Sequence, residues 1–184
     1  MNWRQTDIEG VLIGSRPRFY DERGWFEEAL SSRLCGHDQG TWLQLNTSLS
    51  HQNVVRGLHL QAQYPQAKWV WPVVGDIWDV VVDMRPGSPS FGRWFATKLS
   101  ASQSHVIFIP KGCAHGFATL TEPAIVQYAV DAPYRPDDEL VLRFDDPFFS
   151  IPWPVSRPVT SEKDRNGVLW AQLDFSKGYP RVSE

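Results

Sequence analysis

Basic and polar side chains gather in one short stretch, residues 54–68, which reads VVRGLHLQAQYPQAK. Its valines and leucines predict a β-strand, yet it also carries Arg56, His59, Gln61 and Lys68. Such groups are costly to bury unless they find partners. The stretch is therefore either a solvated edge of a sheet or one wall of a pocket.

The alternation of side chains along this strand predicts a local break at Gly57. In a regular strand alternate residues share a face, so Arg56 would point to the apolar side with Leu58, away from His59. Glycine tolerates the dihedral angles of a β-bulge, and one extra residue would turn both polar side chains the same way. We predict a bulge at Gly57 that lets Arg56 and His59 share one cavity.

His59 and His115 each lie near a strand end, so a metal site is the first chemistry to consider. Cupin metal sites bring two histidines one residue apart, a nearby glutamate and a later third histidine. Here Gln61 stands where the second histidine would be, and no acidic residue follows before Asp76. Three protein ligands are hard to assemble, and we predict no metal site.

Motifs for hydrolysis and phosphate cradling are also missing. There is no G-x-S-x-G, no glycine-rich loop before a helix, and no evident histidine partner for Cys35 or Cys113. Proton transfer remains, for which histidine is suited by its unperturbed pKa of about 6.5. The candidate orienting carboxylates are Asp79, Asp83, Asp145, Asp146 and Asp164, and the candidate acids or stacking groups are Tyr128 and Tyr134. Spacing alone leaves this choice open.

Short β-strands are the elements that must position these groups. Alternating or β-branched runs that end at turn residues predict strands at 41–48, 76–84, 104–110, 125–130 and 140–144. Helical periodicity is weak, with its best candidates at 28–34 and 169–173. Many short strands without βαβ alternation predict an all-β sandwich or jelly roll.

Composition indicates one globular domain over residues 1–184, whose last ten or so residues are polar and loosely held. The net charge of −3 excludes a strongly basic surface for nucleic acid. No apolar run approaches the roughly 20 residues that span a bilayer, and no signal peptide is evident. Two sparse cysteines, Cys35 and Cys113, favour free thiols in a reducing compartment. We expect a cytoplasmic protein.

Nine short motifs, in order and closely spaced as in that family, resemble the dTDP-4-dehydrorhamnose 3,5-epimerases. They are DERGWFEE (21–28), QLNTS (44–48), VVRGLHLQ (54–61), PQAKWV (65–70), VGDIWDVVVDMRPGSPSFG (74–92), IPKGCAHGF (109–117), QYAVDAPYRPDDE (127–139), IPWP (151–154) and SEKD (161–164). Each motif is weak evidence by itself, whereas nine in order are specific.

The resemblance implies a cupin-like jelly roll, a double-stranded β-helix sandwich with a few short helices, that forms a homodimer and uses no metal or organic cofactor. It also implies a dTDP-linked 4-keto-6-deoxy sugar as substrate, inverted at C5 and in the full activity at C3, in rhamnose biosynthesis. Both carbons flank the C4 carbonyl, which acidifies their hydrogens and makes an enolate a sensible intermediate.

Catalytic roles follow from the motif matches. His59 matches the catalytic base, and Asp164 matches the carboxylate that fixes its tautomer and stabilises the imidazolium. Tyr128 matches the acid that returns a proton on the opposite face. Lys68 matches the cation near the C4 oxygen, where negative charge develops.

Substrate-binding residues follow in the same way. Arg23 and Arg56 match contacts to the diphosphate and sugar, Tyr134 matches the ring that stacks on thymine, and His115 matches a pocket histidine. Further polar ligand contacts match Glu28, Gln44, Asn46, Glu139 and Lys163. In relatives the segment with Arg23 and Glu28 commonly reaches the other subunit's site, so dimerisation would complete each pocket.

Three departures from the family pattern leave alternatives open. Thr160, Leu45 and Cys113 replace a common leucine, aspartate and aromatic residue, respectively. A C3-only or C5-only epimerase or a related 4-keto-sugar isomerase remains possible, as do a non-catalytic sugar-nucleotide binding protein and a metal-dependent oxygenase. Asp79 and Asp83 are interpreted as structural, although Asp79 could line the pocket.

Overall fold

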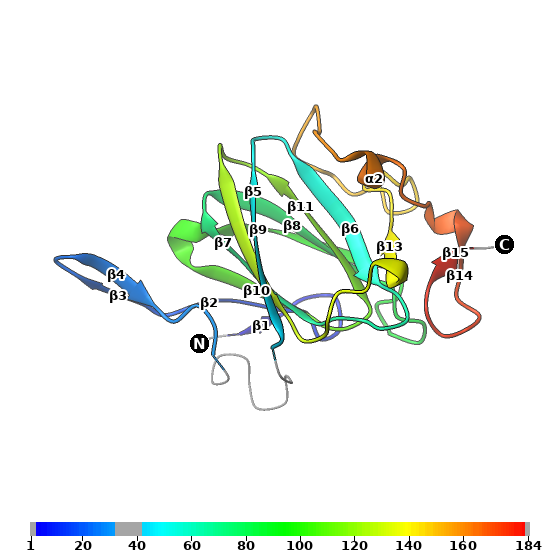
Figure 1. Ribbon diagram of the computed structural model, residues 1–184, viewed down its shortest axis with the longest axis horizontal. Helices are drawn as coiled ribbons and strands as arrows, with labels where there is room; N and C mark the ends of the chain where they lie inside the picture. Colours follow the sequence, from blue (N-terminus) through cyan, green and yellow to red (C-terminus); the bar gives the residue numbers. More distant parts are fainter. Residues whose placement is uncertain (1–2, 32–41, 183–184) are drawn as a thin grey trace.

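Two antiparallel β-sheets face each other in the computed structural model, which describes residues 3–31 and 42–182 (Figure 1). The first sheet has six strands in the order β1 (Arg4–Gln5), β2 (Leu12–Ser15), β10 (His105–Ile109), β7 (Lys68–Val74), β12 (Ala124–Val130) and β5 (Gln44–Ser50). The second has five in the order β13 (Glu139–Val141), β6 (Val55–Gln61), β11 (Cys113–Thr119), β8 (Asp76–Asp83) and β9 (Trp94–Ser100). The predicted all-β class is confirmed.

The remaining elements are short. They are the hairpin β3 (Arg18–Asp21) and β4 (Gly24–Glu27), the hairpin β14 (Leu173–Asp174) and β15 (Arg181–Val182), the helix α2 (Glu162–Arg165), and the 3₁₀ turns η1 (Ala101–Gln103), η2 (Pro136–Asp138) and η3 (Trp170–Gln172). Figure 1 shows the β3–β4 hairpin, in blue, extending away from the body of the molecule.

Hydrophobic side chains fill the space between the sheets and also cover their outer faces. Val70 and Ile107 from the first sheet meet Val81 and Phe117 from the second in one buried cluster. The outer face of the five-stranded sheet is covered by C-terminal residues such as Phe149. Because the space between the sheets is apolar, the polar residues on the inner faces must find partners or line a cavity.

The predicted strands are largely confirmed, with shifted ends. β8, β10 and β12 match the predictions closely, whereas β5 begins three residues later than predicted and the strand predicted at 140–144 ends at Val141. The helix predicted at 28–34 is wrong for residues 28–31, which are irregular, and residues 32–34 lie outside the described chain. The helix predicted at 169–173 is a single 3₁₀ turn.

The predicted break at Gly57 is confirmed. His59 lies opposite His115, and Arg56 lies opposite Phe117, so three residue steps on β6 span two on β11. Gly57 has a φ of +115°, which side-chain-bearing residues rarely adopt. The extra residue brings Arg56 and His59 to the same cavity.

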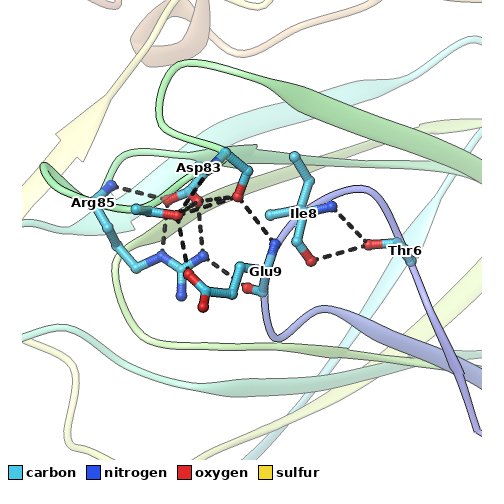
Figure 2. A network of polar contacts seen from close by, with 7 residues as sticks. Thr6, Ile8, Glu9, Asp83 and Arg85 are labelled. Atoms are coloured by element: carbon cyan, nitrogen blue, oxygen red, sulfur yellow. Dashed lines mark hydrogen bonds and ion pairs between the residues drawn. The ribbon is translucent and has the colours of Figure 1, made fainter.

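A buried polar network anchors the end of β8 (Figure 2). The Asp83 carboxylate accepts hydrogen bonds from Arg85 Nε at 2.8 Å and from the hydroxyls of Ser88 and Ser90. Arg85 also donates to the carbonyl of Glu9, so the network ties the N-terminal loop to the loop after β8. Burial would raise the pKa of Asp83, but the bonds from Arg85 and the two serines lower it to about 2.

Candidate active site

A cavity opens between the inner faces of the two sheets. Seven of the residues predicted to act on substrate line it: Arg56, His59, Lys68, His115, Tyr128, Tyr134 and Glu139. They come from β6, β7, β11, β12, β13 and the loop after β12, which are far apart in sequence. The fold therefore assembles most of the predicted site.

His59 and Asp164 form a hydrogen-bonded pair, with 2.6 Å between Nε2 and Oδ1. Asp164 is buried on α2, whose first turn is capped by Ser161. Burial would raise the pKa of Asp164, but hydrogen bonds from His59, Ser161 and the Gly57 backbone hold it below its ordinary value. Asp164 is therefore ionised at neutral pH, and its bond to Nε2 leaves His59 Nδ1 as the ring nitrogen that can take a proton.

His115 belongs to a second pair of the same kind. Its Nε2 lies 2.8 Å from Oδ2 of Asp79, and that carboxylate is fully buried on β8. The other carboxylate oxygen, Oδ1, is buried without a hydrogen bond to any described residue. Two histidines on neighbouring strands thus lie opposite each other, each oriented by an aspartate from a different element.

Lys68 reaches the cavity from β7, and its side chain is almost entirely buried. Its Nζ lies 3.5 Å from the carbonyl oxygen of His59. Burial lowers the pKa of Lys68 to about 8, because loss of water outweighs the attraction of Glu139 and Asp79. The ammonium is still the main form at pH 7.

Tyr128 faces the cavity from β12, in the sheet opposite to the one that carries His59. Burial raises the pKa of its hydroxyl, although Arg56 acts in the other direction. The hydroxyl is therefore protonated at neutral pH and can donate. Arg56 itself is held by hydrogen bonds to Ser50 Oγ and the Leu49 carbonyl.

Tyr134, Glu139 and Lys163 form a chain of contacts at the cavity mouth. The Tyr134 hydroxyl and the Lys163 ammonium both donate to Oε2 of Glu139. Partial burial would raise the pKa of Glu139, but these two bonds hold it below its ordinary value. The Tyr134 ring itself is about half exposed, at 49%.

Besides Lys163, which reaches the cavity only through Glu139, four predicted binding residues do not line this cavity. Gln44 and Asn46 are bonded to each other on the edge strand β5, where Asn46 pairs with Tyr128 in register. Arg23 lies at the tip of the β3–β4 hairpin, paired with Asp21, and Glu28 follows that hairpin. The hairpin points away from the body, so this chain's own cavity does not include Arg23 (Figure 1).

The structure also brings to the cavity three polar residues that received no binding role from the sequence, Gln61, Ser48 and Gln66. Asp79 was a candidate orienting carboxylate, interpreted as structural although it could line the pocket, and it pairs with His115. A charged residue inside an apolar strand, as in IWDVVV, was the available signal for Asp79. Gln61 stood out as a polar residue in an apolar strand, but its partners come from distant segments, and Ser48 gave no signal.

Side chains outside the site offer little further chemistry. Cys113 is a free, buried thiol whose pKa burial raises to about 12, and Cys35 lies outside the described residues. Among residues 3–31 and 42–182, no three His, Cys, Asp or Glu side chains group as metal ligands would. In those same ranges no helix has the length and apolarity to cross a bilayer. The arrangement fits acid–base chemistry on a ligand held between the sheets.

Comparisons with known proteins agree on one family. Residues 5–172 match the family described as dTDP-4-dehydrorhamnose 3,5-epimerase. A relative of that description from Shigella flexneri is 38% identical over 95% of this chain and 99% of its own length. Another from Neisseria gonorrhoeae is 44% identical over 83% of this chain, which spans 45% of that longer protein.

Solved structures agree as well. The chain is similar to dTDP-6-deoxy-D-glucose-3,5-epimerase from Legionella pneumophila in complex with dTDP-4-keto-L-rhamnose, with a TM-score of 0.92, 34% identity and coverage of 100% and 99% of the two chains. It is also similar to a 3'-monoepimerase from Streptomyces bikiniensis in complex with dTDP-quinovose, with a TM-score of 0.84, 31% identity and coverage of 90% and 86%. These likenesses confirm the predicted jelly roll.

Proposed function

This chain belongs to the dTDP-4-dehydrorhamnose 3,5-epimerase family, and we propose that its cavity epimerises a dTDP-linked 4-keto-6-deoxyhexose by proton transfer between His59 and Tyr128. The sequence-based prediction of an isomerase acting on a sugar nucleotide is confirmed at the level of the family. One observation carries the residue roles. A histidine–carboxylate pair and a protonated tyrosine line the same cavity from opposite sheets.

His59 is the base in this proposal. Nδ1 takes a proton from the carbon beside the C4 ketone, and the C–H electron pair becomes part of an enolate. Asp164, fixed by Ser161 and the Gly57 backbone, then faces an imidazolium and stabilises it. The pair thus combines a neutral base before the transfer with a stabilised cation after it.

Tyr128 is the acid. Its hydroxyl gives a proton to the same carbon from the other side, which inverts the configuration. The raised pKa keeps the hydroxyl protonated until that step. Solvent then restores the proton to Tyr128 and removes the one on His59.

Lys68 stabilises the intermediate. The enolate places negative charge on the C4 oxygen, and a buried ammonium stabilises such charge more strongly than water does. The proposed steps need no group beyond these side chains.

The remaining predicted residues bind the nucleotide and sugar in this proposal. Arg56 suits phosphate oxygens through its planar guanidinium. Tyr134 offers its exposed ring to thymine, while Glu139 and Lys163 hold the phenol end. His115, oriented by Asp79, contacts the sugar between the sheets.

We also propose a cytoplasmic homodimer in which the β3–β4 hairpin serves the partner's cavity. The exposed fractions of Phe19, Tyr20, Trp25 and Phe26 on this hairpin are 63, 70, 54 and 69%. An isolated two-stranded hairpin is only marginally stable, so a second copy that covers these rings is the natural occupant. The free thiol of Cys113 supports a reducing compartment.

Solvent exchange tests the activity. Incubation with dTDP-4-keto-6-deoxyglucose in D₂O should place deuterium at C5, C3 or both, as read by mass spectrometry and NMR. His59→Ala should lower the exchange rate by about a thousandfold, the range expected for loss of a general base. His51→Ala is the matched control, because His51 is an exposed histidine that also pairs with a carboxylate, Glu122.

The position of the deuterium separates the candidate reactions. Label at one carbon only favours a mono-epimerase, which the similarity to the Streptomyces bikiniensis 3'-monoepimerase supports as a second candidate. Binding of dTDP without exchange at either carbon, in folded protein, would overturn the catalytic proposal and leave a sugar-nucleotide binding protein.

A further inference from the structure

Gln61 is a buried amide that the proposed chemistry does not use. It lies on β6 two residues after His59, opposite Glu139 of β13, and its exposed fraction is 4%. Its side chain lines the cavity, yet its polar atoms are all directed to backbone groups. A buried amide with all its bonds fixed is a rigid part of the structure.

Two of the three hydrogen bonds of Gln61 flank one residue, Tyr134. Nε2 donates to the carbonyls of Tyr64 at 2.9 Å and Pro133 at 3.3 Å, and Oε1 accepts from the backbone N–H of Arg135 at 2.6 Å. Pro133 and Arg135 are the neighbours of Tyr134 on either side. The amide therefore holds the backbone before and after Tyr134.

Few side chains cover the segment around Tyr134, and a small set of contacts holds it. Residues 133–137 are exposed, and half of the Tyr134 side chain is open to water. Its hydroxyl is bonded to Glu139, which orients the far end of the ring. Nearby, Gln66 Nε2 donates to the Ala132 carbonyl at 2.7 Å, and the Arg135 guanidinium lies 4.2 Å from the centre of the Tyr64 ring. The Gln61 bonds add a restraint on both sides of Tyr134 from the strand that carries the proposed base.

We propose that Gln61 is a positioning residue that sets the nucleobase-stacking platform, Tyr134, relative to His59. This inference rests on the proposed function, since it takes thymine as the group that stacks on Tyr134. Gln61 acts on nucleotide affinity and leaves the proton-transfer step unchanged.

A double-mutant cycle tests the proposal. Gln61→Met keeps the length of the side chain and removes all three bonds. It should raise the Kd for dTDP about five- to tenfold, the lower end of the range for a lost stacking contact. Tyr134→Ala should raise the Kd similarly. The double variant should match Tyr134→Ala within about twofold, because Gln61 acts through that ring.

Gln63→Met is the matched control. Gln63 lies two residues further along, in the loop after β6. Its side chain is exposed, and it makes no side-chain hydrogen bond to the described residues. The control should bind dTDP like the unaltered protein. With saturating substrate, deuterium exchange by Gln61→Met should keep its kcat within about twofold while KM rises.

Three results would overturn the role of Gln61, and a fourth would overturn the proposed function instead. An unchanged Kd in Gln61→Met, additive effects in the double variant, or a fall in kcat at saturation would overturn the proposal. If the unaltered protein does not bind dTDP, the proposed function fails instead. Should Gln61→Met not fold, Gln61→Asn, which withdraws the amide by one methylene, takes its place under the same criteria.

Discussion

At the scale of single residues, the charge of Lys68 should make the rate of the proposed reaction depend on pH. Since its pKa is about 8, its ammonium is lost as the pH rises through that value. We therefore expect kcat/KM to fall about tenfold per pH unit above about pH 8, as the charge that stabilises the enolate disappears. The measurement is the exchange rate at low substrate concentration between pH 6 and 10.

Lys68→Arg provides the comparison. A guanidinium stays protonated at every pH in this range, so the alkaline fall should move upward even if the maximal rate drops. An alkaline limb with the same midpoint in both proteins would show that another group titrates.

The residues of the site could be predicted only in part from the sequence. His59, Tyr128 and Asp164 lie far apart in the chain, so their spacing carried no information and the family resemblance alone paired them. Asp79 was visible as a charge in an apolar strand, but its partner His115 emerges only from the β8–β11 register. Which residues face each other across strands depends on the fold, and a single sequence does not show it directly.

At the scale of the elements, the bulge in β6 leaves no room for a side chain at Gly57. A Cβ at Gly57 would lie 2.5 Å from Gly116 Cα and 2.8 Å from the His115 carbonyl oxygen, at a φ of +115°. Gly57→Ala should therefore lower the free energy of unfolding by roughly 2–4 kcal/mol, measured by urea denaturation.

Gly87→Ala separates the steric clash of an added Cβ from the backbone strain of a positive φ. Gly87 also has a positive φ, +89°, but no atom lies within 4 Å of its added Cβ. Gly87→Ala should therefore lower the free energy of unfolding only by the backbone strain, about 1 kcal/mol. Equal costs in the two variants would contradict the close approach of β6 and β11.

Strands whose residue pattern is regular over their whole length were predicted correctly from the sequence. β8, β10 and β12 consist of alternating or β-branched residues that end at turns, so their pattern sufficed. The four-residue helix α2 was missed because it is too short to show a helical period, and only the Ser161 cap marks its start. Residues 28–31 have apolar spacing over too few positions to distinguish a helix from irregular chain.

At the scale of the whole molecule, complementation tests the proposed dimer. Arg23→Ala and His59→Ala should each lose activity at low substrate concentration. If Arg23 serves the partner's cavity, a mixed dimer has one intact site, and refolding the two variants together should restore about a quarter of the activity. Recovery is read as deuterium exchange after mixing.

Arg143→Ala is the control for that experiment. Arg143 pairs with Asp145 two residues along, as Arg23 pairs with Asp21, and both pairs are exposed. It should keep full activity alone. If the mixture of Arg23→Ala and His59→Ala stays inactive although it contains dimers, Arg23 acts within its own subunit or not at all.

The strand β6 also fixes the spacing between two parts of the site. His59 and Gln61 occupy alternate positions, about 6.8 Å apart along a stiff strand, so the base and the nucleobase platform keep a fixed separation. In the proposed function the phosphates of the ligand lie between the base and the platform. A change that moves β6 would therefore shift His59 and, through Gln61, Tyr134 together, and the two ends of a bound ligand would keep their spacing.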